Sequence, residues 1–414
     1  MIYLDYAAAT PVNKKALEAM EPYFTEHFFN PSSPYLPAKQ VRADYEDAKA
    51  TIARCIGAKG TDLIMTSGAT ESINLAFTVL DKYDEDNRYF RDRSEVTTEK
   101  ERRSPVTTGR ADACLEKPII LILATEHASV RETAKQFNYQ EIKVKKDGHI
   151  DLDDFRQKLA HDVQLVSISL ANNELGTIQP LAEISQIIRE ERLKRLKDGD
   201  KTPIYLHSDA SQALNLLDIN VSRLGVDLLT LNAAKVGGPK GVGALYVGHG
   251  IKLCPITRGG GQERGLRSGT ENVPGAIGFA VALKEAKSHL VSNRKKYQEF
   301  SKIMSERIIK PGFIIPIKHK LGNFITLVFP GLDAERLIYK LENEEIYVST
   351  GAACAANKGQ KSHVLTAIGL SDEEIAGSIR ITFGTDNTKE QIIKAAKIIS
   401  ETVEKENFRL AKKA

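Results

Sequence analysis

The sequence has few cysteines, and no pair of them has a recognisable spacing. Its 414 residues contain four, Cys55, Cys114, Cys254 and Cys354. No CxxC motif is present, and no histidine and cysteine spacing is typical of a zinc site. We therefore expect reduced thiols and no metal centre. Cys55 and Cys254 stand in helical and apolar stretches and are expected to be small core residues.

The sequence also lacks a long apolar run and a large excess of charge of either sign. No segment approaches the roughly 20 apolar residues that span a bilayer, and Asp5 stands where a signal peptide would be basic. Lysine and arginine total 58 against 54 aspartate and glutamate residues, a formal net charge of +4. This balance does not favour nucleic acid or an anionic membrane as a partner. We expect a cytoplasmic protein that acts on a small molecule.

Short apolar runs alternate with amphipathic helical patterns through the middle of the chain. The runs include "PIILILA", "VQLVSISLA", "PIYLHSDA" and "VDLLTLNAA". This alternation predicts an α/β fold, with a mainly parallel sheet flanked by helices. Ligands of such sheets bind at the carboxyl ends of the strands. The functional residues are therefore expected directly after the strands.

The sequence pattern changes near residue 255. Longer helical patterns, followed by strand, helix and strand, predict a smaller α+β domain. We predict a large domain over residues 14–255 and a small domain made of residues 1–13 and 256–414. Residues 83–117 are rich in charges of both signs and poor in apolar residues, which predicts a mobile, solvated insertion. A role for this insertion in docking a partner stays open.

Two candidate positions follow the early strands. The segment "SGATES" places the backbone N–H groups of Gly68, Ala69 and Thr70 at the start of a helix, where a phosphate binds well. The same segment could serve only as a helix cap. His127, in "TEH", also follows a strand, and is either a loop residue or a catalytic one.

Asp209 and Lys235 follow two later strands. Asp209 could cap the next segment, or it could hold the protonated ring nitrogen of pyridoxal phosphate. Lys235 stands among small residues in "LNAAKVGGPKG" and is either a solvated loop lysine or the lysine that forms a Schiff base with that cofactor. A phosphate cradle, an aspartate and a lysine at successive strand ends form one consistent site for pyridoxal 5'-phosphate.

Ten segments in the same order carry a resemblance to a known family. They are "YLDYAAATPV", "NPSS", "SGATES", "TEH", "NNELG", "DASQ", "GPKGVGALYV", "GGGQERGLRSGTENV", "TGAAC" and "SIRITFG". In them the chain resembles the cysteine desulfurases of the NifS/IscS type, pyridoxal-phosphate-dependent members of the class V aminotransferases. The resemblance extends over nearly the whole chain except the charged insertion, and it implies a PLP-dependent transferase of fold type I.

The resemblance implies a reaction and partners. L-Cysteine would give L-alanine and a persulfide on Cys354, and the enzyme would be a homodimer. The spacing from Cys354 to "SHVL" resembles the branch that passes sulfur to iron–sulfur scaffold or tRNA-thiolation proteins. Two other enzyme activities stay open, those of a selenocysteine lyase and of another class V aminotransferase, as does a non-catalytic scaffold that has lost tight cofactor binding.

The resemblance also implies roles for individual cofactor-binding residues. Lys235 would hold the cofactor and act as the base, Asp209 would pair with the ring nitrogen, and His127 would stack on the ring. Gln212 would contact the phenolic oxygen. Thr70 would bind the phosphate beside the backbone N–H of Ala69, and Thr270 would bind the phosphate of the other subunit. Asn232, which stands where the family has a serine, could supply one phosphate donor in its place.

For the substrate, Asn173 and Arg380 would grip the carboxylate, which suits a guanidinium because it can form two parallel hydrogen bonds. One departure from the family bears on the cofactor. The family usually has Ser-Gly-His before the lysine, and this chain has Asn232, Ala233 and Ala234. Two phosphate contacts are thereby lost or changed, so we expect looser cofactor retention.

Overall fold

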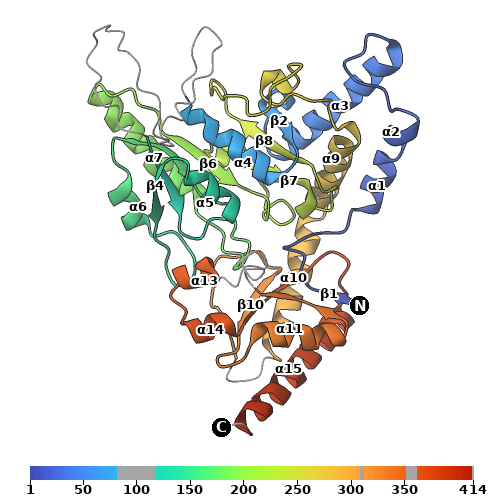
Figure 1. The fold of residues 1–414 in the computed structure, drawn as a ribbon, viewed down its shortest axis with the longest axis vertical. Helices are drawn as coiled ribbons and strands as arrows, with labels where there is room; N and C mark the ends of the chain where they lie inside the picture. The colour runs from blue at the N-terminus through green and yellow to red at the C-terminus, as the bar shows by residue number, and fades with distance from the viewer. Residues whose placement is uncertain (82–117, 308–311, 351–360, 413–414) are drawn as a thin grey trace, which may run out of the picture.

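The computed structural model describes residues 1–81, 118–307, 312–350 and 361–412. The predicted insertion at 83–117 lies outside the described residues, as do Cys114 and Cys354. Figure 1 shows a large sheet flanked by helices above, and a smaller group of helices and strands below that holds the C-terminal helix. The two domain boundaries near residues 13 and 255 stay predictions.

The centre of the fold is a seven-stranded sheet with the strand order β2-β8-β7-β6-β5-β3-β4. All neighbouring strands are parallel except at β8, which runs antiparallel to both β2 and β7. The predicted α/β fold with a mainly parallel sheet is therefore confirmed. The strands of this sheet are β2 (Leu63–Thr66), β3 (Ile119–Leu123), β4 (Asn138–Ile142), β5 (Val163–Ser167), β6 (Tyr205–Asp209), β7 (Leu228–Asn232) and β8 (Gly243–Val247).

The parallel strands are nearly continuous apolar runs because helices cover both faces of the sheet. In β3, Ile120 and Ile122 pack in the cluster that includes the helices α4 (Ala69–Phe77) and α5 (Ala128–Ala134). Leu121 and Leu123 point to the opposite face, into the cluster that includes α3 (Leu36–Cys55) and α7 (Leu181–Lys197). The period of two along a strand thus divides one apolar run between two cores.

The helices of the upper part cover these two faces (Figure 1). Helix α9 packs against α1 and α3. The helix predicted to start within "SGATES" begins at Ala69. The helices are α1 (Lys14–Met20), α2 (Pro22–Thr25), α3 (Leu36–Cys55), α4 (Ala69–Phe77), α5 (Ala128–Ala134), α6 (Leu152–Lys158), α7 (Leu181–Lys197), α8 (Val221–Leu224) and α9 (Val273–Ser288).

The lower part contains a four-stranded antiparallel sheet with the order β12-β13-β10-β9. Its strands are β9 (Phe313–Ile314), β10 (Phe324–Val328), β12 (Ser349–Thr350) and β13 (Ser378–Thr382). A separate parallel pair joins β1 (Ile2–Tyr3) to β11 (Ile346–Tyr347), so the start of the chain lies beside residues near its end. The helices of this part are α10 (Leu290–Ser305), α11 (Ala334–Asn343), α13 (His363–Ala367), α14 (Asp372–Ala376) and α15 (Lys389–Ala411).

Two properties of the described helices and side chains bear on function. None of these helices is both long enough and apolar enough to cross a bilayer. Within the described ranges, no group of three or more His, Cys, Asp or Glu side chains is arranged to hold a metal ion.

Candidate active site

Lys235 lies just beyond β7, in the short 3-10 turn η3 (Ala233–Lys235). The turn is stabilised by Asn232, whose side-chain oxygen accepts a hydrogen bond from the backbone N–H of Ala234 at 3.2 Å. The ammonium group of Lys235 donates hydrogen bonds to the carbonyl oxygens of Ala7 at 2.8 Å and Ala8 at 2.6 Å. The lysine side chain therefore points to the N-terminal segment between β1 and α1.

Asp209 ends β6, the strand next to β7 in the sheet. The Oδ1 atom of its carboxylate accepts hydrogen bonds from the N–H of Ser211 at 2.9 Å and from the hydroxyl of the same serine at 2.6 Å. Among the described residues, both hydrogen bonds to this carboxylate end at Oδ1. The arrangement fixes the rotamer of Asp209 and leaves Oδ2 for a ligand.

His127 precedes α5, in the loop after β3. Its Nδ1 accepts a hydrogen bond from the backbone N–H of Ser129 at 3.1 Å, so His127 caps the helix. Although the imidazole is exposed, desolvation by the surrounding protein lowers its pKa. The charge of Asp209 raises this pKa and that of Lys235 lowers it. The structure therefore brings the three predicted residues together around one neutral imidazole.

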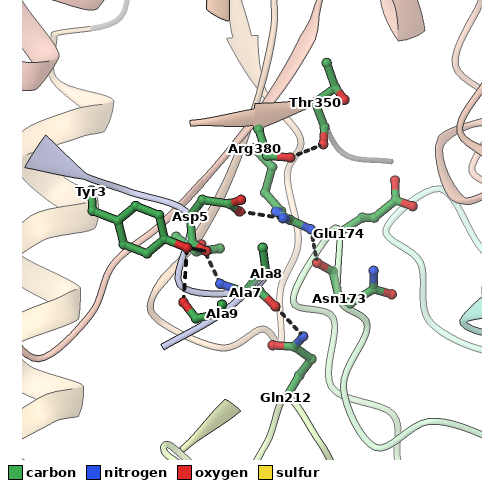
Figure 2. Close-up of polar contacts among 12 residues, drawn as sticks. Tyr3, Asp5, Ala7, Ala8, Ala9, Asn173, Glu174, Gln212, Thr350 and Arg380 are labelled. Atoms are coloured by element: carbon green, nitrogen blue, oxygen red, sulfur yellow. Dashed lines mark hydrogen bonds and ion pairs between the residues drawn. The ribbon is translucent and has the colours of Figure 1, made fainter. Parts of the chain in front are cut away.

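Gln212 and Lys235 both donate a hydrogen bond to the same atom, the carbonyl oxygen of Ala7, so their side chains lie close together. The side-chain amide of Gln212 donates a hydrogen bond to the carbonyl oxygen of Ala7 at 3.0 Å, and the same oxygen accepts from Lys235. Figure 2 shows Gln212 pointing to Ala7 from below, with Ala8 and Asp5 alongside. The carbonyl of Ala7 thus joins two side chains of the large sheet to the N-terminal segment.

The predicted phosphate cradle lies between β2 and α4. Gly68 occupies the N-cap position with φ of +149°, a conformation that favours glycine, and no side chain caps the helix. A Cβ atom at Gly68 would meet no atom within 4 Å. Ala69 is partly exposed and Thr70 is exposed. No described side chain caps the first N–H groups of this nine-residue helix, so they are donors that an anion could use.

Thr270 is exposed and follows the turn η4 (Glu263–Gly265). The same segment approaches the start of α4, because the guanidinium of Arg267 pairs with the carboxylate of Glu71 at 3.0 Å. The role of Thr270 at the phosphate of another subunit stays a prediction.

Arg380 and Asn173 meet between the two parts of the chain. Arg380 lies on β13, and its Nη1 donates a hydrogen bond to the backbone carbonyl of Asn173 at 2.8 Å. Its Nη2 pairs with Oδ1 of Asp5 at 2.6 Å. Figure 2 shows the guanidinium between Asp5 and Asn173. The predicted substrate residues are neighbours, and Asp5 joins them.

Two buried carboxyl groups next to these residues were not identified from the sequence. Glu126 is fully buried, and its Oε1 accepts a hydrogen bond from the N–H of Ser169 at 2.6 Å. Desolvation raises its pKa to about 8, and the charge of Asp209 adds to this effect. Desolvation also raises the pKa of Glu174, which follows Asn173. No periodic pattern marks these acids, because each is buried by distant segments.

The start of helix α13, which carries the motif "SHVL", contacts the loops that hold Glu126 and Glu174. The hydroxyl of Ser362 donates a hydrogen bond to Oε2 of Glu174 at 2.6 Å. The Nε2 atom of His363 lies 2.9 Å from the backbone carbonyl of Glu126. The start of α13 is therefore docked beside His127 and Asn173. Cys354, the predicted nucleophile, lies outside the described residues.

The chain is similar to one family over most of its length. Residues 2–104 and 97–394 match the family described as aminotransferase class-V. The cysteine desulfurase IscS of Dictyoglomus turgidum is 36% identical over 414 residues, covering 98% of this chain and 95% of that protein. The cysteine desulfurase IscS of Methanosarcina thermophila is 34% identical over 417 residues, covering 98% and 92%.

Solved structures give the same result. A structure described as a NifS-like protein has a TM-score of 0.82 and 30% identity, over 97% of this chain and 99% of that one. A structure described as SspA in complex with cysteine has a TM-score of 0.73 and 30% identity, over 92% and 99%. Similarity therefore extends over both parts of the fold.

Proposed function

The chain belongs to the aminotransferase class-V family, and on this premise we propose that it is a pyridoxal-phosphate-dependent cysteine desulfurase that converts L-cysteine to L-alanine. The fold is the α/β fold type I of that family of enzymes. The proposal depends above all on one observation. Lys235, Asp209 and His127 stand at the carboxyl ends of β7, β6 and β3 of one sheet, and the charges of the first two act on the pKa of the third.

The described residues fit pyridoxal phosphate at its ring and aldehyde. Lys235 supplies a primary amine, and the free Oδ2 of Asp209 suits a protonated ring nitrogen. The neutral ring of His127 suits stacking on an aromatic face. The uncapped N-terminus of α4 suits the phosphate.

The fit is poorer beside Lys235. Asn232 uses its side-chain oxygen within η3, so its amide N–H groups are the donors that it could offer a phosphate. Ala234 offers no side-chain donor. The site would therefore hold the phosphate through Ala69, Thr70 and Asn232, with Thr270 of another subunit as a proposed addition in a homodimer.

The chain's own residues divide the reaction between them. Arg380 and Asn173 bind and orient the substrate carboxylate. Bound pyridoxal phosphate supplies electron withdrawal from the substrate Cα. The Nζ atom of Lys235 takes the proton from Cα, and the carbonyls of Ala7 and Ala8 stabilise the resulting ammonium.

The sulfur transfer is assigned to Cys354. Its thiolate attacks the sulfur of L-cysteine, so an S–S bond forms while the C–S bond breaks. The electron pair of the broken bond stays on Cβ, which takes up a proton and becomes the methyl group of L-alanine, and the proton held on Nζ of Lys235 returns to Cα. The products are L-alanine and a persulfide on Cys354, available to an iron–sulfur scaffold or a tRNA-thiolation protein.

A single experiment tests the activity. The purified protein is loaded with pyridoxal phosphate, its visible spectrum is recorded before and after L-cysteine, and alanine and sulfide are assayed in the presence of a thiol reductant. Lys235→Ala should abolish both products and the lysine-bound cofactor band. Cys354→Ala should keep the band and lose sulfide formation.

The outcomes separate the other functions. A cofactor band that changes when L-cysteine is added, without formation of alanine and sulfide, would favour another class V aminotransferase. Alanine from selenocysteine but not from cysteine would favour a selenocysteine lyase. A protein that stays colourless with added pyridoxal phosphate would contradict catalysis and favour a scaffold role.

A further inference from the structure

Arg380, the arginine proposed to bind the substrate carboxylate, is already paired with a carboxylate of the same chain, that of Asp5. Oδ1 of Asp5 accepts a hydrogen bond from Nη2 of Arg380 at 2.6 Å. The side chain of Arg380 is only 4% exposed, and that of Asp5 is 17% exposed. The contact is therefore a largely buried, charge-assisted hydrogen bond of the strong class.

The position of Asp5 is fixed by its neighbours. The phenol of Tyr3 donates a hydrogen bond to the carbonyl of Asp5 at 2.8 Å. On the far side, the N–H of Thr382 donates to the carbonyl of Leu4, and the N–H of Ala7 donates to the hydroxyl of Thr382. Because β13 carries both Arg380 and Thr382, the segment around Asp5 is tied to the same strand as the arginine.

Without substrate, the buried guanidinium of Arg380 needs a counter-charge, and Asp5 provides it. A guanidinium always carries its charge, and burying that charge without a partner is costly. Asp5 supplies the negative charge in the ligand-free chain. When a substrate carboxylate arrives, two anions share one cation, and their mutual repulsion weakens binding.

We propose that Asp5 is the resident counter-ion of Arg380, and that the substrate carboxylate must share the guanidinium with it. Asp5 is a positioning residue that sets the affinity of the site for the carboxylate. The inference rests on the proposed role of Arg380 in substrate binding. It assigns Asp5 a function that goes beyond holding the N-terminal segment.

The test compares Asp5→Asn with the unchanged chain, both loaded with pyridoxal phosphate. Asparagine keeps an oxygen that accepts from Arg380 and removes the competing charge. The dissociation constant of L-alanine, measured by calorimetry, should fall by roughly 100-fold, as expected for removing a like charge about 6 Å away at an effective dielectric constant of about 20. L-Alaninamide, which lacks the carboxylate, should show no such gain.

Stability gives a second readout. The ligand-free Asp5→Asn protein should unfold at a lower temperature than the unchanged chain, because Arg380 has lost its counter-charge. Saturating L-alanine should raise the unfolding temperature more in the variant. Glu345→Gln is the matched control, since it removes an exposed negative charge beside β1, and it should change neither quantity.

The variant Arg380→Lys distinguishes failure of the counter-ion role of Asp5 from failure of the substrate-binding role of Arg380. If this variant weakens L-alanine binding while Asp5→Asn leaves it unchanged or weaker, the counter-ion inference is wrong and the proposed role of Arg380 stands. If Arg380→Lys leaves L-alanine binding unchanged, the proposed substrate site is wrong. Should Asp5→Asn fail to fold, Asp5→Ser, which keeps a hydroxyl acceptor without charge, carries the same expectation.

Discussion

The ammonium group of Lys235 donates a hydrogen bond to the backbone carbonyl of Ala8, 2.6 Å away. These residues are 227 positions apart in the sequence. The contact makes the N-terminal segment part of the site, alongside the strand ends of the large sheet. Because the acceptor is a backbone atom, this hydrogen bond does not depend on the side chain at position 8. It depends on the path that the backbone takes after Asp5.

Cofactor retention should improve when a phosphate donor is restored beside Lys235. We expect Ala234→His to slow the loss of pyridoxal phosphate by at least about tenfold, because a hydrogen bond to a charged group contributes roughly 1.5 to 3 kcal/mol. The decay of the visible cofactor band during dialysis measures the rate. Ala234→Leu adds bulk without a donor and is the control. Equal decay rates for the histidine variant and the unchanged chain would contradict the prediction.

The sequence predicted the large sheet well because its signals are local. A run such as "IILIL" has the length and composition of a buried strand, and β3 (Ile119–Leu123) lies there. The same logic placed Asp209 and Lys235 after neighbouring strands, since parallel strands present their carboxyl ends at one edge. The roles of the individual site residues came from the family resemblance, and they stay predictions.

The sequence did not reveal the contacts that close the site. Asp5 carries no sign that it faces Arg380, because 375 residues separate them and only the packing of β13 brings them together. Nothing in the motif "TEH" marks Glu126 as a buried acid, for the same reason. Its burial comes from Ser169 and α13, which belong to other segments of the chain.

His207 should make stability depend on pH below neutrality. It is fully buried on β6 between the hydroxyls of Ser167 and Thr230, at 2.8 and 3.0 Å. Desolvation lowers its pKa from 6.5 to about 3. Between these values the unfolded chain binds a proton that the folded chain does not, so the free energy of unfolding rises with pH and falls as the solution is acidified.

The variant His207→Gln removes this contribution while keeping a donor and an acceptor. Urea unfolding of both proteins between about pH 4 and pH 6 should show a slope that is steeper for the unchanged chain by about 1.4 kcal/mol per pH unit. The exposed His249→Gln is the control and should keep the steep slope. Parallel slopes for His207→Gln and the unchanged chain would show that the buried imidazole titrates normally.

Glu126 should produce the opposite dependence. Burial and the nearby charge of Asp209 raise its pKa from 4.5 to about 8. Between these values the folded chain holds a proton that the unfolded chain has lost, so the free energy of unfolding falls as pH rises. Glu126→Gln is neutral throughout and should flatten that fall when unfolding is followed from pH 5 to pH 8. Glu404→Gln, which changes an exposed residue on α15, is the control and should keep the fall in the free energy of unfolding. If Glu126→Gln also kept that fall, the prediction of a raised pKa for Glu126 would be wrong.

The buried ion pair between Lys49 and Glu263 should be the main support of the turn that leads to Thr270. Nζ of Lys49 lies 2.9 Å from Oε2 of Glu263, and the two side chains are 8% and 4% exposed. The same carboxylate accepts hydrogen bonds from the phenol of Tyr45 at 2.6 Å and the N–H of Met65 at 2.9 Å. Lys49→Met leaves this carboxylate buried without its counter-charge.

We expect Lys49→Met to lower the free energy of unfolding by about 3 to 5 kcal/mol, the usual result of breaking a buried pair from one side. Adding Glu263→Gln should recover part of the loss, because a neutral amide oxygen can still accept from Tyr45 and Met65 while no charge stays buried. Lys15→Met is the control, since its pair with Glu285 is exposed on the lysine side and should contribute less than about 1 kcal/mol. Chemical denaturation of the four proteins measures these differences. A double variant less stable than Lys49→Met alone would mean that the carboxylate is stabilised by its hydrogen bonds rather than by the lysine charge.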